Sequence, residues 1–484
     1  MNRIIEDNIK LHDTSQFEIK ISYPVNFKKR RSIYEVDVFL FSPYHLNINS
    51  KNYTKEDFYR QIKNYIRLKT PLFSLKEIIH HAKSPIFLLK ESLKEDNLEK
   101  IEYHVKMLCS ILKSTTRNYV RNLDLNQKKD RLKEDLNDFN DFVLKFTKIF
   151  RKLKKKFIDC QSYLFYCYAD EFISLCLEAY SFELLEQLKT QSAAFQKKYI
   201  PIFIEFVEKE RRHRKRMGFL SIPDPKTDNE IMIYRKSHLK KYALSILFLS
   251  TLIKESGKIL KQMSFGLAAA LAMIFATLVA VFSSKYYGPL TLPFVTIVVI
   301  AYIFKDRIKD VVKHFFANKV LRDYVSDHKL KIYDSKNKKI GIFREQFQFI
   351  SSQKLPQKIK KIRNSDPFAK VTYSKVKEVI FYYSKKVRIS SKRVAKSLKD
   401  YEFKAIDDIF RLNFDFIMRK CDDSNKKLIY PVNENKYEMV KGKKYYYFFL
   451  VLRYKNGNEE EYKSYRLTLG RKGIKRLEPY EVNQ

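Results

Sequence analysis

The chain of 484 residues contains no tryptophan, only nine glycines and only five cysteines. Glycine is needed in loops that cradle phosphate groups, and the sequence has no Gly-x-x-x-x-Gly-Lys-Ser/Thr, Gly-x-Gly-x-x-Gly or Gly-x-Ser-x-Gly pattern. We therefore predict no cofactor and no catalytic residue. The cysteine count is odd and the spacing is unpaired, which indicates a reducing compartment rather than a disulfide framework.

Negative charge is also scarce, because 55 Asp and Glu stand against 96 Lys and Arg, a formal net charge of +41. Such an excess predicts attraction to anionic surfaces, either phospholipid head groups or nucleic acid. A lysine-rich, tryptophan-free composition is also typical of an AT-rich genome. That alternative explains part of the charge without any specific role.

Charge of either sign is absent from Met263 to Ser284, and Lys285 is the only charged residue as far as Phe304. An uncharged helix of about 20 residues matches the hydrocarbon thickness of a bilayer. We predict a transmembrane hairpin over residues 263–304, with helices at 263–283 and 287–304. The alternative is a helical hairpin buried in a large soluble core.

A stripe of small residues runs along the first of these helices. Small side chains let another helix backbone approach closely inside a membrane. The stripe fits packing against the second helix, and it also fits a homodimer seam. Its members are Gly266, Ala268, Ala272, Ala276 and Ala280.

Basic residues flank the predicted hairpin on the sides that continue into the rest of the chain. We predict contacts to anionic lipid head groups for Lys261, Lys305, Arg307 and Lys309. The first ten residues have no apolar core of a signal peptide. These observations together predict a multi-pass protein of the inner (cytoplasmic) membrane with both termini in the cytoplasm.

The remaining chain reads as an α+β protein. Residues 1–90 hold two alternating strands near 17–23 and 34–40, and a helix capped by Thr54 and Asp57 that ends near Thr70-Pro71. Residues 91–217 repeat apolar residues every three or four positions, which predicts an antiparallel helical bundle. Residues 218–262 form a linker and an amphipathic or interfacial helix, and residues 305–484 form a β-rich domain.

Four segments carry a likeness to known proteins: DFYRQIKNYIRLKTP at 57–71, FGLAAALAM at 265–273, AYIFKDRIKD at 301–310 and YRLTLGRKGIKRLE at 465–478. In this order they resemble a family of uncharacterised bacterial integral membrane proteins with a central pair of transmembrane helices. The resemblance implies a membrane protein, and it implies no activity, cofactor or catalytic residue.

Two Glu-x-x-His steps, Glu77 with His80 and Glu210 with His213, are candidate metal ligands. In ferritin-like bundles two such steps and single glutamates, which Glu171 or Glu178 would supply, hold two iron or manganese ions. Nine histidines among 55 acidic residues produce about one such step by chance, so we predict no metal site.

The sequence thus predicts an integral membrane protein that acts as a non-enzymatic scaffold or interaction module with an unidentified protein partner. Two other classes stay open. One is a membrane-tethered enzyme whose site has no motif, for which a deep pocket with converging polar groups is expected. The other is a membrane-tethered nucleic-acid-binding protein, in which aromatic and basic residues alternate.

Overall fold

The computed structural model describes residues 5–157, 160–255, 258–315, 326–366, 377–397, 399–423, 425–433 and 436–480. The chain forms two compact units, and each combines distant parts of the sequence. The β unit comprises Met1–Tyr65, Ser250–Ser397 and Asp408–Gln484; the helical unit comprises Ile66–Leu249 and Leu398–Asp407. Helices take up 49% of the chain and strands 29%, which confirms the mixed α+β class.

An eight-stranded antiparallel sheet has the order β14-β13-β12-β3-β8-β7-β6-β5. Its strands are β3 (Ser32–Pro43), β5 (Ser250–Glu255), β6 (His328–Tyr333), β7 (Lys339–Ile350), β8 (Glu378–Ile389), β12 (Tyr446–Asn456), β13 (Glu459–Gly470) and β14 (Gly473–Pro479). The N-terminal strand β3 therefore pairs with the C-terminal strands β8 and β12, although the sequence predicts separate domains for residues 1–90 and 305–484. Alternation identifies a strand and its buried face, but it does not identify the neighbouring strand.

A second sheet has the order β1-β2-β9-β4, formed by β1 (Glu6–Leu11), β2 (Gln16–Pro24), β9 (Ala405–Asn413) and β4 (Ile62–Leu68). The strand predicted near residues 17–23 is confirmed as β2, and Phe17, Ile19, Ile21 and Tyr23 are at most 2% exposed. Its other face is not solvated as the alternation predicted, since Glu18 and Ser22 are also buried.

The helix predicted to reach Thr70-Pro71 is shorter in the structure. Helix α1 (Lys55–Gln61) begins with the predicted capping box between Thr54 and Asp57, but it ends where β4 begins. The apolar spacing of β4 fits a helix as well as a strand, and pairing in the second sheet decides the outcome.

Beyond residue 318, strands β6, β7, β8, β9, β12 and β13 confirm that this part of the chain is rich in strands, and Gly457 (φ 63°) forms the turn between β12 and β13. The apolar segment from Ile409 to Met418 is only partly strand, because Asp415–Met418 forms helix α14. Three features were not predicted from the sequence: β5, β14 and a separate two-stranded sheet of β10 (Asn425–Asn433) and β11 (Lys436–Lys443). Besides α1, the short helices in the described part of the β unit are η1 (Tyr44–Leu46), η5 (Ser352–Lys354), α12 (Gln357–Asn364), α13 (Ser391–Ser397) and α14 (Asp415–Met418). Ile359 and Ile362 of α12 pack on Phe39, Phe41 and Phe449 of the large sheet.

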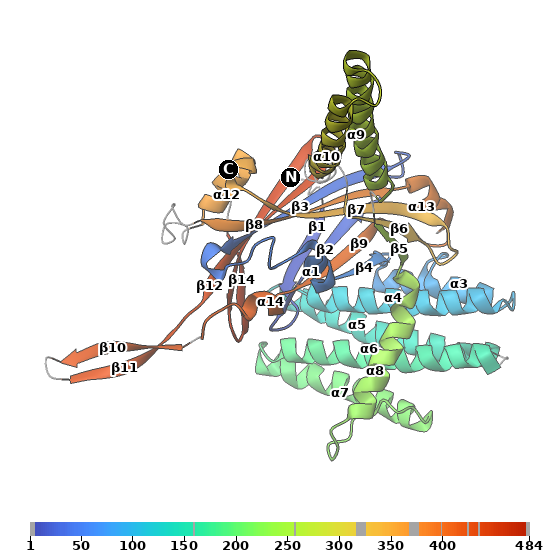
Figure 1. The fold of residues 1–484 in the computed structure, drawn as a ribbon. Coiled ribbons are helices and arrows are strands. Elements are labelled where there is room, and N and C mark those ends of the chain that lie inside the picture. Colours follow the sequence, from blue (N-terminus) through green and yellow to red (C-terminus); the bar gives the residue numbers. More distant parts are fainter. Residues whose placement is uncertain are drawn as a thin grey trace. The chain divides into compact units, whose positions relative to one another are not determined.

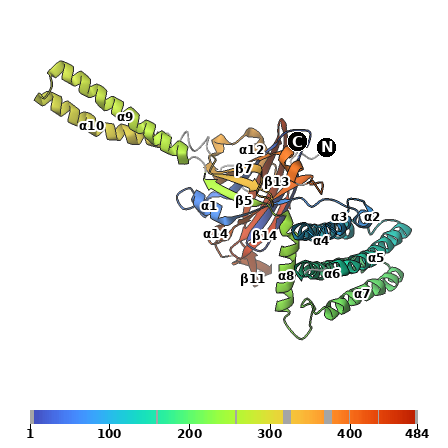
Figure 2. The same cartoon turned by 90° about the vertical axis from the view of Figure 1, so that its right-hand side faces the viewer.

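The helical unit contains α2 (Leu75–His80), α3 (Pro85–Ser92), α4 (Leu98–Arg121), α5 (Lys129–Lys152), η2 (Leu153–Lys156), α6 (Cys160–Leu188), α7 (Ala193–Arg216), α8 (Glu230–Leu244) and η3 (Ser245–Leu247). Helices α4 to α7 run side by side and α8 crosses them (Figures 1 and 2). The predicted apolar repeat is buried: Leu136, Phe139, Val143 and Phe146 are at most 1% exposed.

Residues 218–262, predicted as a linker with an interfacial helix, contain structured elements of both units. Helix α8 packs in the bundle, where the Ser110 hydroxyl donates to the Ala243 carbonyl at 2.9 Å, and Ser250–Glu255 is strand β5 of the large sheet.

Candidate membrane anchor and charged clusters

Helix α9 (Lys258–Tyr287) contains the first predicted membrane segment. Within Gln262–Tyr287, the most apolar 18-residue window has a mean hydropathy of 2.5, and 11% of that window is buried. A core helix of a soluble protein is mostly buried, and a signal sequence lies near the N-terminus, so α9 resembles neither. These 26 residues extend about 39 Å, more than the thickness of bilayer hydrocarbon. Among the described residues, α9 is the one helix long and apolar enough to cross a membrane.

The second predicted segment, residues 287–304, is shorter in the structure. Tyr287 ends α9, Gly288 (φ 75°) and Leu290 (φ 67°) lie in the turn, and helix α10 runs from Leu292 to Phe315. Lys305 follows after 13 helical residues, which extend about 20 Å. The short uncharged part of α10 therefore does not support the predicted second crossing.

Helices α9 and α10 form an antiparallel hairpin (Figure 2). Ala268 and Ala272 of α9 are at most 1% exposed, Ala301 of α10 is 5% exposed, and the Lys313 ammonium lies 4.6 Å from the Phe265 ring centre. Of the other predicted packing residues, Ala276 and Ala280 are half-buried and Gly266 is exposed. The small side chains at Ala268 and Ala272 thus allow α10 to approach α9.

The predicted head-group residues lie near the ends of the apolar parts of the hairpin. The Lys305 ammonium lies 3.5 Å from the centre of the Tyr302 ring, and Arg307 and Lys309 are exposed. The side chain of Lys261 lies outside the described part of the structure.

Glu77 and His80, the first candidate metal pair, are on the short helix α2. The Glu77 carboxylate accepts a hydrogen bond from the Ser74 backbone N–H at 2.6 Å, and this bond holds the pKa of Glu77 below its ordinary value. His80 is exposed. Glu77 therefore caps its own helix.

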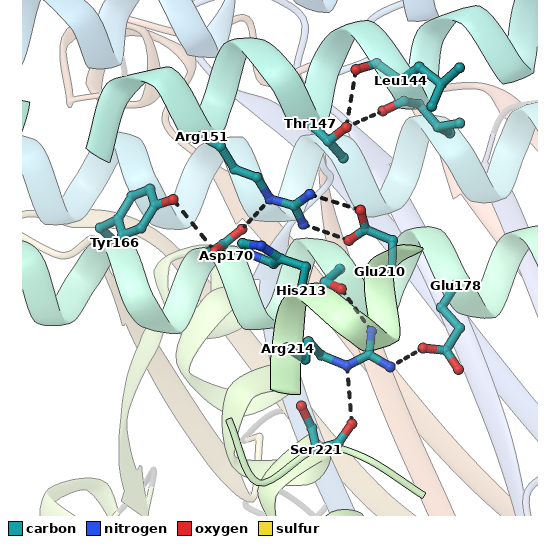
Figure 3. Close-up of polar contacts among 12 residues, drawn as sticks. Leu144, Thr147, Arg151, Tyr166, Asp170, Glu178, Glu210, His213, Arg214 and Ser221 are labelled. Carbon is teal, nitrogen blue, oxygen red and sulfur yellow. Dashed lines mark hydrogen bonds and ion pairs between the residues drawn. The ribbon is translucent and has the colours of Figure 1, made fainter. Parts of the chain in front are cut away.

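Glu210 and His213, the second pair, belong to a buried ion network in the helical unit (Figure 3). The Arg151 guanidinium donates to both Glu210 oxygens at 2.9 and 2.6 Å and to Asp170 at 3.2 Å. His213 Nε2 lies 2.7 Å from the other Asp170 oxygen. Burial alone would lower the pKa of Arg151, but the two carboxylates raise it above its ordinary value.

The other acidic candidates also pair with guanidinium groups. Glu178 accepts from Arg211 at 3.0 Å and from Arg214, whose side chain is fully buried, while Glu171 accepts from Arg235 at 2.7 Å. Within the described ranges, no group of three or more His, Cys, Asp or Glu side chains is arranged to hold a metal ion. The structure thus gives these residues cationic partners and does not bring the two Glu-x-x-His steps together.

The basic end of α7 divides between an inner and an outer face. Glu210, Arg211, His213 and Arg214 join the network, whereas four exposed cations line a hollow of about 430 Å³ on the other side. These four are Lys209, Arg212, Lys215 and Arg216. The inner arginines are neutralised by acidic partners, so the outer cations carry the net charge of this helix end.

A larger cavity of about 800 Å³ lies between α2, α4 and α5. Aromatic and aliphatic side chains line it together with four aspartates. Two of these aspartates form exposed ion pairs, Asp138 with Lys76 at 3.0 Å and Asp141 with Lys145 at 3.4 Å. The Tyr119 hydroxyl donates to the Asp135 carbonyl at 2.8 Å. The cavity has room for a small organic molecule.

The β unit contains a buried charged cluster that was not predicted from the sequence. Lys385 of β8 lies 3.0 Å from Glu345 and 2.8 Å from Asp408, and the Tyr23 hydroxyl donates to Asp408 at 3.3 Å. Burial raises the pKa of the Asp408 carboxyl; it would lower that of Lys385, but the two carboxylates raise it instead. No local signal distinguishes Lys385 from its neighbours in the strand.

Comparisons with protein-family models, curated proteins and solved structures found no match. The likeness to bacterial membrane proteins therefore rests on the four short segments alone.

Proposed function

We propose that the chain is an integral membrane protein, anchored by the α9–α10 hairpin, that acts as a non-enzymatic scaffold or interaction module at the membrane surface. The exposed apolar surface of α9 carries this proposal. Leu271, Ile274, Leu278, Val281 and Phe282 are between 43% and 59% exposed. Each such residue favours insertion by about 0.3 to 0.6 kcal/mol at the centre of a membrane helix.

In the proposed arrangement both helices of the hairpin cross the membrane, and both termini lie in the cytoplasm. The apolar part of α10 extends about 20 Å, and hydrocarbon is about 30 Å thick. The turn at Gly288–Thr291 adds length at one end, and Lys305 can extend its ammonium toward the head groups at the other. A cysteine at Ser284 tests this topology, because a membrane-impermeant thiol reagent added to intact cells should label it.

The outer cations of α7 are the proposed contact to anionic head groups. Lys209, Arg212, Lys215 and Arg216 surround one hollow, and a cation close to an anionic membrane surface contributes about 1 kcal/mol. The +41 net charge supports the same partner.

Extraction of isolated membranes separates anchoring from electrostatic attachment. High salt should leave the protein in the membrane fraction, because it screens charges but does not weaken helix insertion. Leu278→Arg places a charge at mid-helix, costs about 3 kcal/mol of insertion and should release a fraction of the protein. Leu252→Arg, at a position that is 46% exposed in β5, is the matched control and should stay in the membrane. Wild-type protein in the soluble fraction would contradict the proposal.

The cavity of the helical unit favours a second candidate function, the binding of a small organic molecule. Its wall combines apolar side chains with Asp135 and the Tyr119 hydroxyl group. A thermal-shift screen with Phe142→Ala as the cavity variant tests it, since a ligand of this cavity should stabilise the wild type more than the variant.

A further inference from the structure

Strands β10 and β11 form an antiparallel hairpin in which every large side chain is exposed. Its register pairs Ile429 with Met439, Pro431 with Tyr437, and Lys427 with Lys441. Residues two apart share a face, so these six side chains form one surface, which we call the lysine face. Ile429, Tyr437 and Met439 on this face are 69%, 66% and 60% exposed.

The opposite face differs in charge. There Leu428 pairs with Val440 and Tyr430 pairs with Glu438, so a carboxylate stands among the apolar side chains. We call this surface the glutamate face. The lysine face, by contrast, carries only cations beside its apolar residues.

Two observations indicate that another molecule contacts the lysine face in the functional protein. An isolated two-stranded hairpin is marginally stable in water, and in the described part of the chain no third strand pairs with β10 or β11. Lys427 also stands directly opposite Lys441, and like charges at such a position destabilise a hairpin unless an anion lies between them. The missing partner should therefore supply both apolar contact and negative charge.

We propose that the lysine face docks on an anionic phospholipid surface. Lipid phosphates would lie between Lys427 and Lys441, while Ile429, Tyr437 and Met439 reach the interface, where tyrosine is enriched. The hairpin stays at head-group depth, because its free strand edges need water for their hydrogen bonds. This docking rests on the proposed function, since α9 brings the β unit to the membrane.

Charge argues against a second copy of the hairpin as the partner. Residues 425–443 contain five lysines and two glutamates, so two hairpins would repel each other. An anionic lipid surface attracts the same residues.

The absence of tryptophan provides a direct test, since one introduced tryptophan is the only one in the chain. Met439→Trp reports on the lysine face and Val440→Trp on the glutamate face, both in full-length protein reconstituted into vesicles. In phosphatidylcholine vesicles with added phosphatidylglycerol, the emission of the Met439→Trp variant should shift to shorter wavelength and brominated lipid should quench it. These changes should be absent in vesicles of phosphatidylcholine alone, and the Val440→Trp variant should show them in neither kind of vesicle.

Neighbouring lysines provide the charge control. Lys427→Gln in the Met439→Trp background should reduce the docked-to-undocked ratio about fivefold, as expected for one lysine at an anionic surface. Lys426→Gln, on the glutamate face, should change it by less than about twofold, as expected for a cation that points away from the lipid. Equal effects of the two substitutions would overturn the proposal.

A third reporter, Phe275→Trp in α9, separates this inference from the anchor. If brominated lipid quenches the Phe275→Trp variant but not the Met439→Trp variant, the docking is refuted and the anchor stays intact. If neither variant is quenched, the proposed membrane function fails as well. In neutral vesicles, the emission of the Met439→Trp variant could also shift to shorter wavelength as the protein concentration rises. That result would identify a second copy as the partner and overturn the lipid assignment.

Discussion

The Lys385 ammonium lies 2.8 Å from the Asp408 carboxylate, and the side chains are 1% and 0% exposed. Lys385 belongs to β8 of the eight-stranded sheet and Asp408 to β9 of the four-stranded sheet. Glu345 of β7 lies 3.0 Å from the same ammonium. Both residues lie in the β unit, where the pair joins two sheets, and a charge left there without its partner is costly.

Replacement of this lysine should destabilise the protein strongly. Lys385→Met leaves Glu345 and Asp408 buried without a cation, and the free energy of unfolding should fall by about 3 to 5 kcal/mol. Urea unfolding of detergent-solubilised protein measures the change. Lys386→Met is the matched control, because Lys386 is 63% exposed and should contribute less than about 1 kcal/mol. Equal losses in the two variants would refute the importance of the buried pair.

Arg151 should be equally critical in the helical unit. Arg151→Met removes the cation that binds both Asp170 and Glu210, which are 1% and 2% exposed, and the unfolding free energy should fall by about 3 kcal/mol. Urea unfolding monitored by the helical circular dichroism signal measures this change. Lys152→Met, at the exposed neighbouring position, should behave like the wild type. If these residues held two metal ions, a chelator would lower the unfolding free energy of the protein. If they form an ion network, a chelator should leave the unfolding free energy unchanged.

Cys176 should make the helical unit sensitive to alkali. Burial raises its pKa from 9.0 to about 12, so the folded state favours the neutral thiol. This contribution is complete below pH 9 and is lost as the pH rises from 9 toward 12, by about 1.4 kcal/mol per pH unit.

Cys176→Ala removes the titrating group. Above pH 9, the unfolding free energy of the wild type should therefore fall relative to that of this variant by about 1.4 kcal/mol per pH unit. Cys167→Ala, at a half-buried position, should show a weaker pH dependence. A difference that stays constant between pH 8 and about pH 10.5 would contradict the burial argument.

The sequence predicts elements whose signal is local. The uncharged run from Met263 to Ser284 identified α9, and the apolar repeat through Phe139 and Val143 identified a buried face of the bundle. It could not identify the buried charges. Lys385 and Lys386 are adjacent and chemically identical, and only strands distant in the sequence decide that one is buried between carboxylates.

Two other elements escaped prediction for different reasons. The start of α10 was placed too early, because the turn residues before Leu292 are as uncharged as the helix. Strands β10 and β11 were missed because both of their faces combine lysine with apolar residues, so the usual contrast between a buried and a solvated face is lacking.

The stripe of small residues in α9 allows a test of the two alternatives for its partner. Ala272 is 1% exposed and faces α10, whereas Ala270 is exposed. If α10 covers the stripe, Ala272→Cys should trap no more disulfide-linked dimer in oxidised membranes than the native cysteines do. Ala270→Cys, in the same background, measures dimers formed by random collision. Dimers trapped at position 272 but not at 270 would show that two copies of α9 pack through this face and that α10 lies elsewhere in the membrane.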